Sequence, residues 1–256
     1  MRTLLALVLA LAALAPGAAA QAPAIAAAAD LTYALTEIAA AYKRETGNDV
    51  RIAFGSSGNF TQQIEHGAPF ELFLSADEAY VERLAAGGLT RGAGTLYAVG
   101  RIALFVPRGS PLAAEPTLAD LKLALRDGRV RRFAIANPEH APYGRAAREA
   151  LRHAGLWDAI SPALVLGENA SQAMQFAAGG ATQGGIVPWS LAKAPEVAKL
   201  GTAALLPADW HAPLRQRMVL LKSATPRAVA FHAYLGSPEA RRIFIRYGFV
   251  LPGEAG

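Results

Sequence analysis

Short apolar segments alternate with amphipathic helical patterns along almost the whole chain of 256 residues. The apolar segments 24–29, 50–54 and 133–136 are each followed by a stretch in which apolar residues recur every three or four positions. This alternation is typical of α/β proteins, in which helices cover the faces of a parallel sheet. Because 53% of the residues are hydrophobic and only 18% are charged, intrinsic disorder is excluded. We therefore expect a folded α/β protein built on parallel sheets.

The order of these segments predicts two lobes with a cleft between them. Two terminal helices, 226–235 and 238–247, have no strands of their own and are expected to pack back on the first lobe. The first lobe would then comprise 21–100 plus 206–256, and the second lobe 101–205. Strands are expected at 24–29, 50–54, 71–74, 102–106, 133–136, 163–166, 185–187 and 218–221.

The first twenty residues have the pattern of a secretory signal peptide. Arg2 is followed by an apolar run over 4–14 and by small residues at 18–20. This run is shorter than the roughly 20 residues that a membrane-spanning helix needs. We expect cleavage before Gln21 and export as a free periplasmic protein, since no cysteine is available for a lipid anchor.

Several classes of chemistry are excluded or disfavoured. A chain without cysteine has no thiolate metal site, iron–sulfur cluster, cysteine nucleophile or disulfide. The five histidines lack metal-ligand spacing, and phosphate-binding and nucleophile-elbow motifs are absent. The net charge of +5 is scattered, which disfavours nucleic-acid binding. We expect no metal site, no cofactor and no enzymatic activity.

The turns that follow the expected strands are the remaining candidates for function. Turns 55–59, 137–144 and 167–170 are rich in small and polar residues and lead into helices. Helix N-termini present unpaired backbone N–H groups and a partial positive charge, which suit an anion. In open α/β sheets, ligands bind at these carboxyl ends of the strands.

Six segments around these turns carry a recognisable pattern: AAAADL (26–31), FGSSGNFTQQIEHGAPFELFLSAD (54–77), NPEHAPYGRAAREAL (137–151), GENASQA (167–173), GGIV (184–187) and RRIFIRYGF (241–249). In these segments the sequence resembles the periplasmic molybdate-binding protein family, the solute receptors of ABC-type molybdate importers. The resemblance implies a two-lobed type II periplasmic binding fold that closes by a hinge around a dianion held by hydrogen bonds alone. It also implies a monomer that delivers molybdate, or tungstate, to an inner-membrane permease.

The resemblance assigns ligand positions to Asp30, Ser57, Tyr143 and Ala170. Ser57 would offer a hydroxyl and an N–H group, Ala170 an N–H group, and Tyr143 either its backbone amide or its phenol. A tyrosine that some members place after GIV is Pro188 here, and Tyr143 is the expected replacement.

Asp30 departs most from the family pattern, which has Ser, Thr or Asn there. Two unit charges 4 Å apart repel by about 4 kcal/mol at an effective dielectric constant of 20. Asp30 could cap the following helix and offer only its backbone N–H to the anion. It could instead accept a proton from a protonated oxyanion, or attract a cationic or metal-containing solute.

Two alternatives to molybdate binding remain open at this point. Asp30 and Pro188 are compatible with a receptor for another solute, such as phosphate, sulfate or a metal-containing ion. An exported hydrolase could use Ser56 or Ser57, but it needs a carboxylate and an imidazole within about 3.5 Å of a serine hydroxyl.

Overall fold

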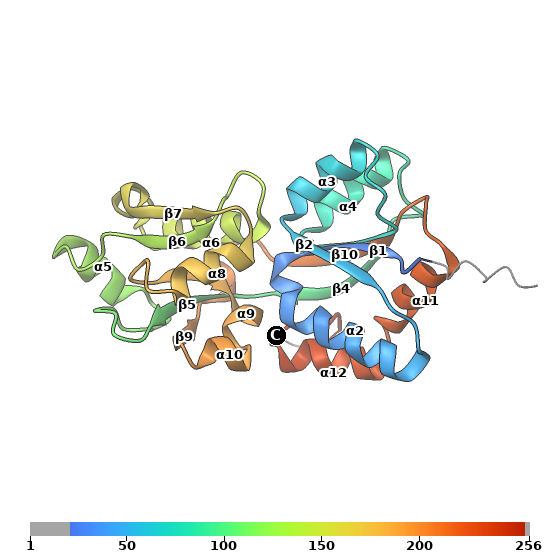
Figure 1. Ribbon diagram of the computed structural model, residues 1–256. Helices are drawn as coiled ribbons and strands as arrows, with labels where there is room; N and C mark the ends of the chain where they lie inside the picture. The colour runs from blue at the N-terminus through green and yellow to red at the C-terminus, as the bar shows by residue number, and fades with distance from the viewer. Residues whose placement is uncertain (1–20, 254–256) are drawn as a thin grey trace, which may run out of the picture.

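The computed structural model describes residues 21–253, so the expected signal peptide lies outside the described residues. The described chain forms two five-stranded sheets with helices on their faces (Figure 1). Within residues 21–253, no helix is both long enough and apolar enough to cross a membrane.

The first sheet has the strand order β2-β1-β3-β10-β4. β1 is parallel to β2 and β3, whereas β10 is antiparallel to β3 and β4. Its strands are β1 (Ala24–Ala28), β2 (Arg51–Gly55), β3 (Leu72–Ser75), β4 (Thr95–Gly100) and β10 (Leu214–Leu220).

The second sheet has the order β7-β6-β8-β5-β9. β6 is parallel to β7 and β8, whereas β5 is antiparallel to β8 and β9. Its strands are β5 (Ile102–Pro107), β6 (Phe133–Ala136), β7 (Leu164–Gly167), β8 (Gly185–Pro188) and β9 (Gly201–Leu205).

Both sheets are therefore mixed, and the expectation of parallel sheets was wrong. The chain leaves the first sheet through β4, enters the second directly through β5, and returns from β9 to β10. A strand by which the chain leaves a sheet and a strand by which it returns at the same side run in opposite directions. This applies to β4 and β10 in the first sheet and to β5 and β9 in the second. Only the strands joined by helical crossovers are parallel.

Helices cover both faces of the first sheet. Figure 1 places α3 and α4 on one face and α2, α11 and α12 on the other. The C-terminal helices accordingly pack on this sheet's side of the molecule, α12 against α2 and α11 against β10. These helices are α2 (Thr32–Thr46), α3 (Ser57–Glu65), α4 (Glu78–Ala86), α11 (Pro226–Tyr234) and α12 (Pro238–Arg246).

The second sheet has its own core, in which Phe105 and Phe133 are fully buried, and helices α6 and α8 pack directly on its strands. Its helices are α5 (Ala119–Arg126), α6 (Pro142–His153), α7 (Trp157–Ile160), α8 (Ala170–Ala178), α9 (Trp189–Ala192) and α10 (Pro195–Ala198). Three short 3₁₀ helices, η2 (Ala29–Leu31), η3 (Ser161–Ala163) and η4 (Ala208–Trp210), complete the described chain.

Candidate ligand-binding site

A small cavity of about 10 Å³, room for about one water molecule, lies where turns of both lobes meet. Asp30, Ser57, Tyr143 and Ala170, the residues expected from the sequence, all contribute to its wall. The remaining lining residues are Ala28, Ala29, Gly55, Ser56, Ala76, Ala141 and Pro142. The residues of the cavity wall thus include one acidic residue, Asp30, and no Lys, Arg or His.

The first turns of α3, α6 and α8 present backbone N–H groups at this cavity. Other first-turn amides are taken: Ser56 Oγ accepts from Asn59, Asn169 Oδ1 accepts from Gln172, and the Gly58 N–H donates to the His140 carbonyl. Within residues 21–253, no protein acceptor is found for the N–H groups of Ser57, Tyr143 and Ala170. Three unpaired donors at helix N-termini suit an anion.

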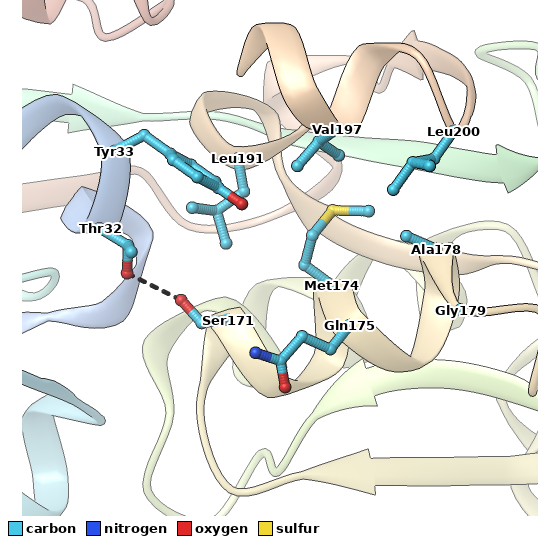
Figure 2. Close-up of a pocket in the computed structure, with 10 residues that line it drawn as sticks. All are labelled: Thr32, Tyr33, Ser171, Met174, Gln175, Ala178, Gly179, Leu191, Val197 and Leu200. Carbon is cyan, nitrogen blue, oxygen red and sulfur yellow. Dashed lines mark hydrogen bonds between the residues drawn. The ribbon is translucent and has the colours of Figure 1, made fainter.

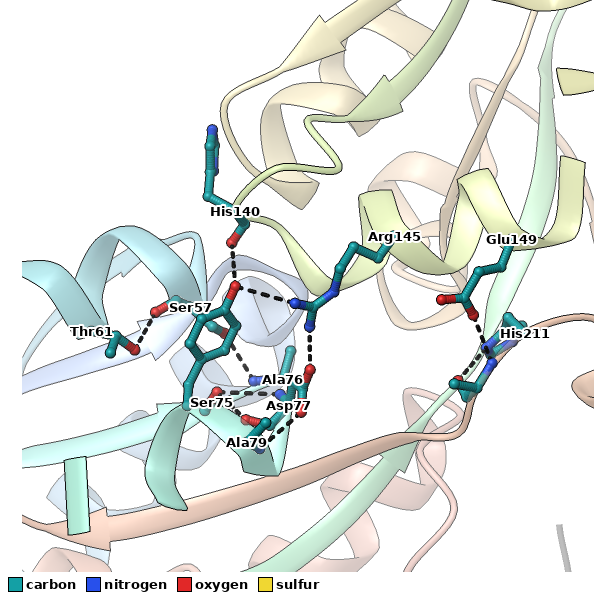
Figure 3. Close-up of polar contacts among 12 residues, drawn as sticks. Ser57, Thr61, Ser75, Ala76, Asp77, Ala79, His140, Arg145, Glu149 and His211 are labelled. Atoms are coloured by element: carbon teal, nitrogen blue, oxygen red, sulfur yellow. Dashed lines mark hydrogen bonds and ion pairs between the residues drawn. The ribbon is translucent and has the colours of Figure 1, made fainter. Parts of the chain in front are cut away.

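Ser57 adds a hydroxyl to these donors. Its side chain is fully buried, and its Oγ accepts the backbone N–H of Ala76 at 3.0 Å. Because the oxygen is held as an acceptor, the hydroxyl proton is available for an acceptor in the cavity. Figure 3 shows Ser57 beside Ala76, at the end of β3.

Asp30 does not cap a helix, and the capping interpretation is wrong. Neither η2 nor α2 has a side-chain capping bond, and Asp30 lies inside η2 rather than before it. Its carboxylate is 1% exposed, and its Oδ2 accepts from Tyr143 Oη at 2.9 Å and from Gln216 Nε2 at 2.7 Å. Oδ1 is buried without a hydrogen-bond partner.

Burial raises the pKa of Asp30 to about 6, while hydrogen bonds from Gln216 and Tyr143 oppose the rise. Desolvation is the larger effect because water is excluded from the charged form and no cation compensates. Burial and the nearby Asp30 charge hold the pKa of Tyr143 and of Tyr97 well above the usual phenol value. Both phenols therefore keep their protons and act as donors.

The sequence analysis missed Gln216, Tyr97 and Ser190, which hold Asp30 in place. Tyr97 Oη donates to Gln216 Oε1 at 2.7 Å, which turns the amide nitrogen of Gln216 toward Asp30. Ser190 Oγ donates to the Asp30 carbonyl at 2.8 Å. Gln216 is fully buried between Leu214 and Met218 on the inward side of β10. The sequence does contain a sign of this role: Gln216 is a polar residue among apolar residues on the buried face of a strand.

Pro188 stands away from the cavity wall, at the end of β8 opposite Ile102. The phenol of Tyr143 lies within the Asp30 cluster, 3.0 Å from Gln216 Nε2 as well as bonded to Asp30. Tyr143 therefore reaches this cluster from α6, in the neighbouring turn.

Contacts across the cleft hold the two lobes together (Figure 3). Arg145 on α6 forms an ion pair with Asp77, the N-cap of α4, and its guanidinium lies over the ring of Tyr80. The His140 carbonyl accepts from Gly58 N at 3.1 Å and from Tyr80 Oη at 3.5 Å. These contacts define a closed arrangement of the lobes.

The hydrolase hypothesis meets only one of its two requirements. His140 Nδ1 lies 3.0 Å from Ser56 Oγ, and Glu168 lies 3.5 Å from the other ring nitrogen of His140. No carboxylate is within bonding distance of the Ser56 or Ser57 hydroxyl in the described chain. Ser56 instead caps α3 and bonds to the opposite lobe.

A larger cavity of about 400 Å³ lies between α2 and helices α8 to α10 (Figure 2). Its wall is mainly apolar, including Met174, Leu191 and Val197, and it borders the bond of 2.9 Å between Thr32 Oγ1 and Ser171 Oγ. It lacks the convergent N–H donors of the small cavity. Among residues 21–253, no group of three or more His, Cys, Asp or Glu side chains is arranged to hold a metal ion.

Comparison with known proteins places these features in a family. Residues 24–250 match the family described as bacterial extracellular solute-binding protein. The molybdate-binding protein ModA of Rhodobacter capsulatus is 39% identical over 251 residues, which cover 97% of this chain and 94% of that protein.

Solved structures agree. The periplasmic molybdate-binding protein of Azotobacter vinelandii superposes with a TM-score of 0.80 and 30% identity over 90% of this chain and 99% of that one. The sulfate-binding protein SubI of Mycobacterium tuberculosis has a TM-score of 0.74 at 15% identity, over 91% of this chain and 88% of that one, which shows a shared fold alone. The chain therefore belongs to the bacterial extracellular solute-binding proteins and, within them, to the family of the ModA molybdate-binding proteins.

Proposed function

We propose that this protein is the molybdate receptor of an ABC-type importer, that it also takes tungstate, and that it delivers the anion to a permease in the inner membrane. The observation that carries the proposal is the set of free N–H donors of Ser57, Tyr143 and Ala170 around one cavity. Two relatives that are 39% and 37% identical to this chain are named molybdate-binding proteins.

The proposed binding mode uses neutral donors alone. The N–H groups of Ser57, Tyr143 and Ala170 and the hydroxyl of Ser57 would surround the anion, with Asp30 at one side. Donors fixed by helix first turns need no rearrangement, so their dipoles stabilise the bound charge without a counter-ion. The chain acts as a receptor without catalytic activity.

Calorimetric titration with molybdate, tungstate, sulfate and phosphate tests this function. We expect micromolar or tighter binding of molybdate and tungstate, with weaker binding of sulfate and phosphate. At 100 times the dissociation constant the bound anion should stabilise the fold by about 2.7 kcal/mol. If neither molybdate nor tungstate binds, the proposal is wrong.

A receptor for another oxyanion is the second candidate, because the carboxylate of Asp30 opposes a dianion. Phosphate, which carries a proton near neutral pH, could donate it to Asp30 Oδ1. Tighter binding of phosphate than of molybdate in the same titration would favour this candidate. Asp30→Ser separates the two, since it should weaken phosphate binding and strengthen molybdate binding several-fold.

We further propose that residues 1–20 are removed on export to the periplasm, that the mature protein is a monomer, and that its lobes are 21–100 with 206–256 and 101–205. Mass spectrometry of the periplasmic protein should give Gln21 as the first residue. Light scattering should give the mass of one mature chain.

A further inference from the structure

We propose that anion binding at this site is coupled to the uptake of one proton by Asp30, whose protonated Oδ1 donates a hydrogen bond to the bound oxyanion. The inference rests on the proposed function and adds a pH dependence to it. Its starting point is Oδ1 of Asp30, a buried acceptor without a hydrogen-bond partner on a residue that lines the anion cavity.

The hydrogen bonds around Asp30 leave only one place for the proton. Oδ2 already accepts from Tyr143 Oη and from Gln216 Nε2, so its lone pairs are occupied. The phenol of Tyr143 keeps its proton and therefore donates to Oδ2. The hydrogen bond from Tyr97 orients the amide of Gln216 so that its nitrogen also donates to Oδ2. A proton on Oδ1 preserves all of these bonds and turns the one free acceptor into a donor.

Among residues 21–253, the groups that face Asp30 carry no charge that could balance the anion. The titratable groups that face it are Tyr143 on α6 and Tyr97 on β4, and both are neutral. Gln216 on β10 and Ser190 on α9 are uncharged partners. The cavity wall contains no basic side chain that could pair with a carboxylate beside an anion.

The ligand-free carboxyl is poised to take up this proton. Burial raises the pKa of Asp30 to about 6, so the group is mostly ionised at pH 8 and half protonated near pH 6. A dianion in contact with the carboxyl raises this pKa further, because like charges disfavour the ionised form. The proton comes from bulk solvent, so the complex gains one anion and one proton.

Asp30→Asn is the variant that imitates the protonated state. Its Oδ1 can accept from Tyr143 and Gln216 in place of Asp30 Oδ2, while its amide N–H₂ donates into the cavity. The variant keeps the shape of the side chain and cannot ionise.

Calorimetric titration of molybdate in buffers of different ionisation enthalpy tests the proposal, because the heat then reports protons taken up. At pH 8 the wild type should take up about one proton per anion, and Asp30→Asn about none. The dissociation constant of the wild type should rise up to tenfold per pH unit between pH 7 and 9. That of Asp30→Asn should change less than threefold.

The possible results separate this inference from the function on which it rests. Tight molybdate binding with no proton uptake and no pH dependence overturns the role of Asp30 and leaves the receptor function intact. Uptake that persists in Asp30→Asn assigns the proton to another group and also overturns it. Failure of the wild type to bind molybdate and tungstate at any pH from 5 to 9 overturns both.

Discussion

At the scale of single residues, burial of the Asp30 carboxyl determines how the ligand-free fold responds to pH. Its pKa is about 6 in the folded protein and 3.8 in the reference state, so the folded state holds the proton more tightly. The stability that this provides is present below pH 3.8 and is lost as the pH rises to about 6. At 1.36 kcal/mol per pKa unit, the loss is on the order of 3 kcal/mol.

Urea unfolding of ligand-free wild type and Asp30→Asn at pH 4, 5, 6 and 7 measures this effect. We expect the free energy of unfolding of the wild type to fall relative to the variant across this range. Asp49→Asn is the control, because Lys43 lowers the pKa of the exposed Asp49 and its stabilisation is lost as the pH falls. Equal differences between wild type and Asp30→Asn at pH 4 and 7 would contradict the assignment.

Gly100 provides a second residue-scale prediction, because it leaves room for the Asp30 cluster. A Cβ atom at this position would lie 2.2 Å from Tyr143 Oη and 2.7 Å from Gln216 Nε2. Gly100→Ala should therefore displace both donors and weaken molybdate binding at least tenfold in calorimetric titration. Gly87→Ala is the matched control, since its nearest contact would be an ordinary 3.5 Å. Unchanged affinity in Gly100→Ala would show that the cluster does not support the site.

The residues of the site could be predicted only in part. Asp30, Ser57, Tyr143 and Ala170 each follow a strand. Because the carboxyl ends of the strands meet at one edge of a sheet, the sequence could predict that these residues line one cavity. The role of the Asp30 side chain could not be predicted, because that role depends on Gln216, which is 186 positions away in sequence. Capping is a local rule, and here tertiary hydrogen bonds override it.

At the scale of elements, prediction succeeded where hydrophobicity and β-propensity agree. β5 (Ile102–Pro107) is rich in branched and aromatic residues and was expected within one residue of its limits. β9 (Gly201–Leu205) was missed because glycine and alanine have low β-propensity, and β4 (Thr95–Gly100) was missed as well. β10 begins four positions before the predicted 218, since the exposed Arg215 and the half-buried Arg217 alternate with buried residues.

α3 contacts the 137–141 turn of the other lobe so closely that a single added atom at Gly58 should prevent the lobes from closing. A Cβ at Gly58 would lie 2.6 Å from the His140 carbonyl oxygen and 3.0 Å from Tyr80 Oη, which themselves join the lobes. Gly58→Ala should keep the fold of each lobe but hold the lobes apart, and so weaken molybdate binding about tenfold or more.

Small-angle scattering with saturating molybdate, together with calorimetry, measures both parts of this expectation. The Gly58→Ala complex should have a larger radius of gyration than the wild-type complex. Gly236→Ala, whose new Cβ would meet only the Ala233 carbonyl at 3.4 Å, is the control away from the cleft. Wild-type affinity and dimensions in Gly58→Ala would show that this contact is not needed for closure.

At the scale of the whole molecule, two chain connections limit how the lobes can move. Arg101 joins β4 to β5, and 206–213 join β9 to β10. The Arg101 guanidinium donates to the Leu206 carbonyl at 3.1 Å, and the Leu206 N–H donates to the Ile102 carbonyl at 3.0 Å. Two connections held side by side favour rotation about a single hinge, which opens the cleft on the far side.

The bond between Thr32 and Ser171 offers a direct test of this motion, because the chain has no cysteine of its own. The two hydroxyl oxygens come from different lobes and lie 2.9 Å apart, so cysteines at both positions should form a disulfide in the closed arrangement. Oxidised Thr32→Cys/Ser171→Cys should exchange molybdate at least 100-fold more slowly than the reduced protein. Stopped-flow fluorescence before and after reduction measures the rate, and each single variant controls for the loss of its hydroxyl. If the oxidised protein exchanges the anion as fast as the reduced one, the ligand enters without separation of the lobes, and hinge opening is not part of the binding cycle.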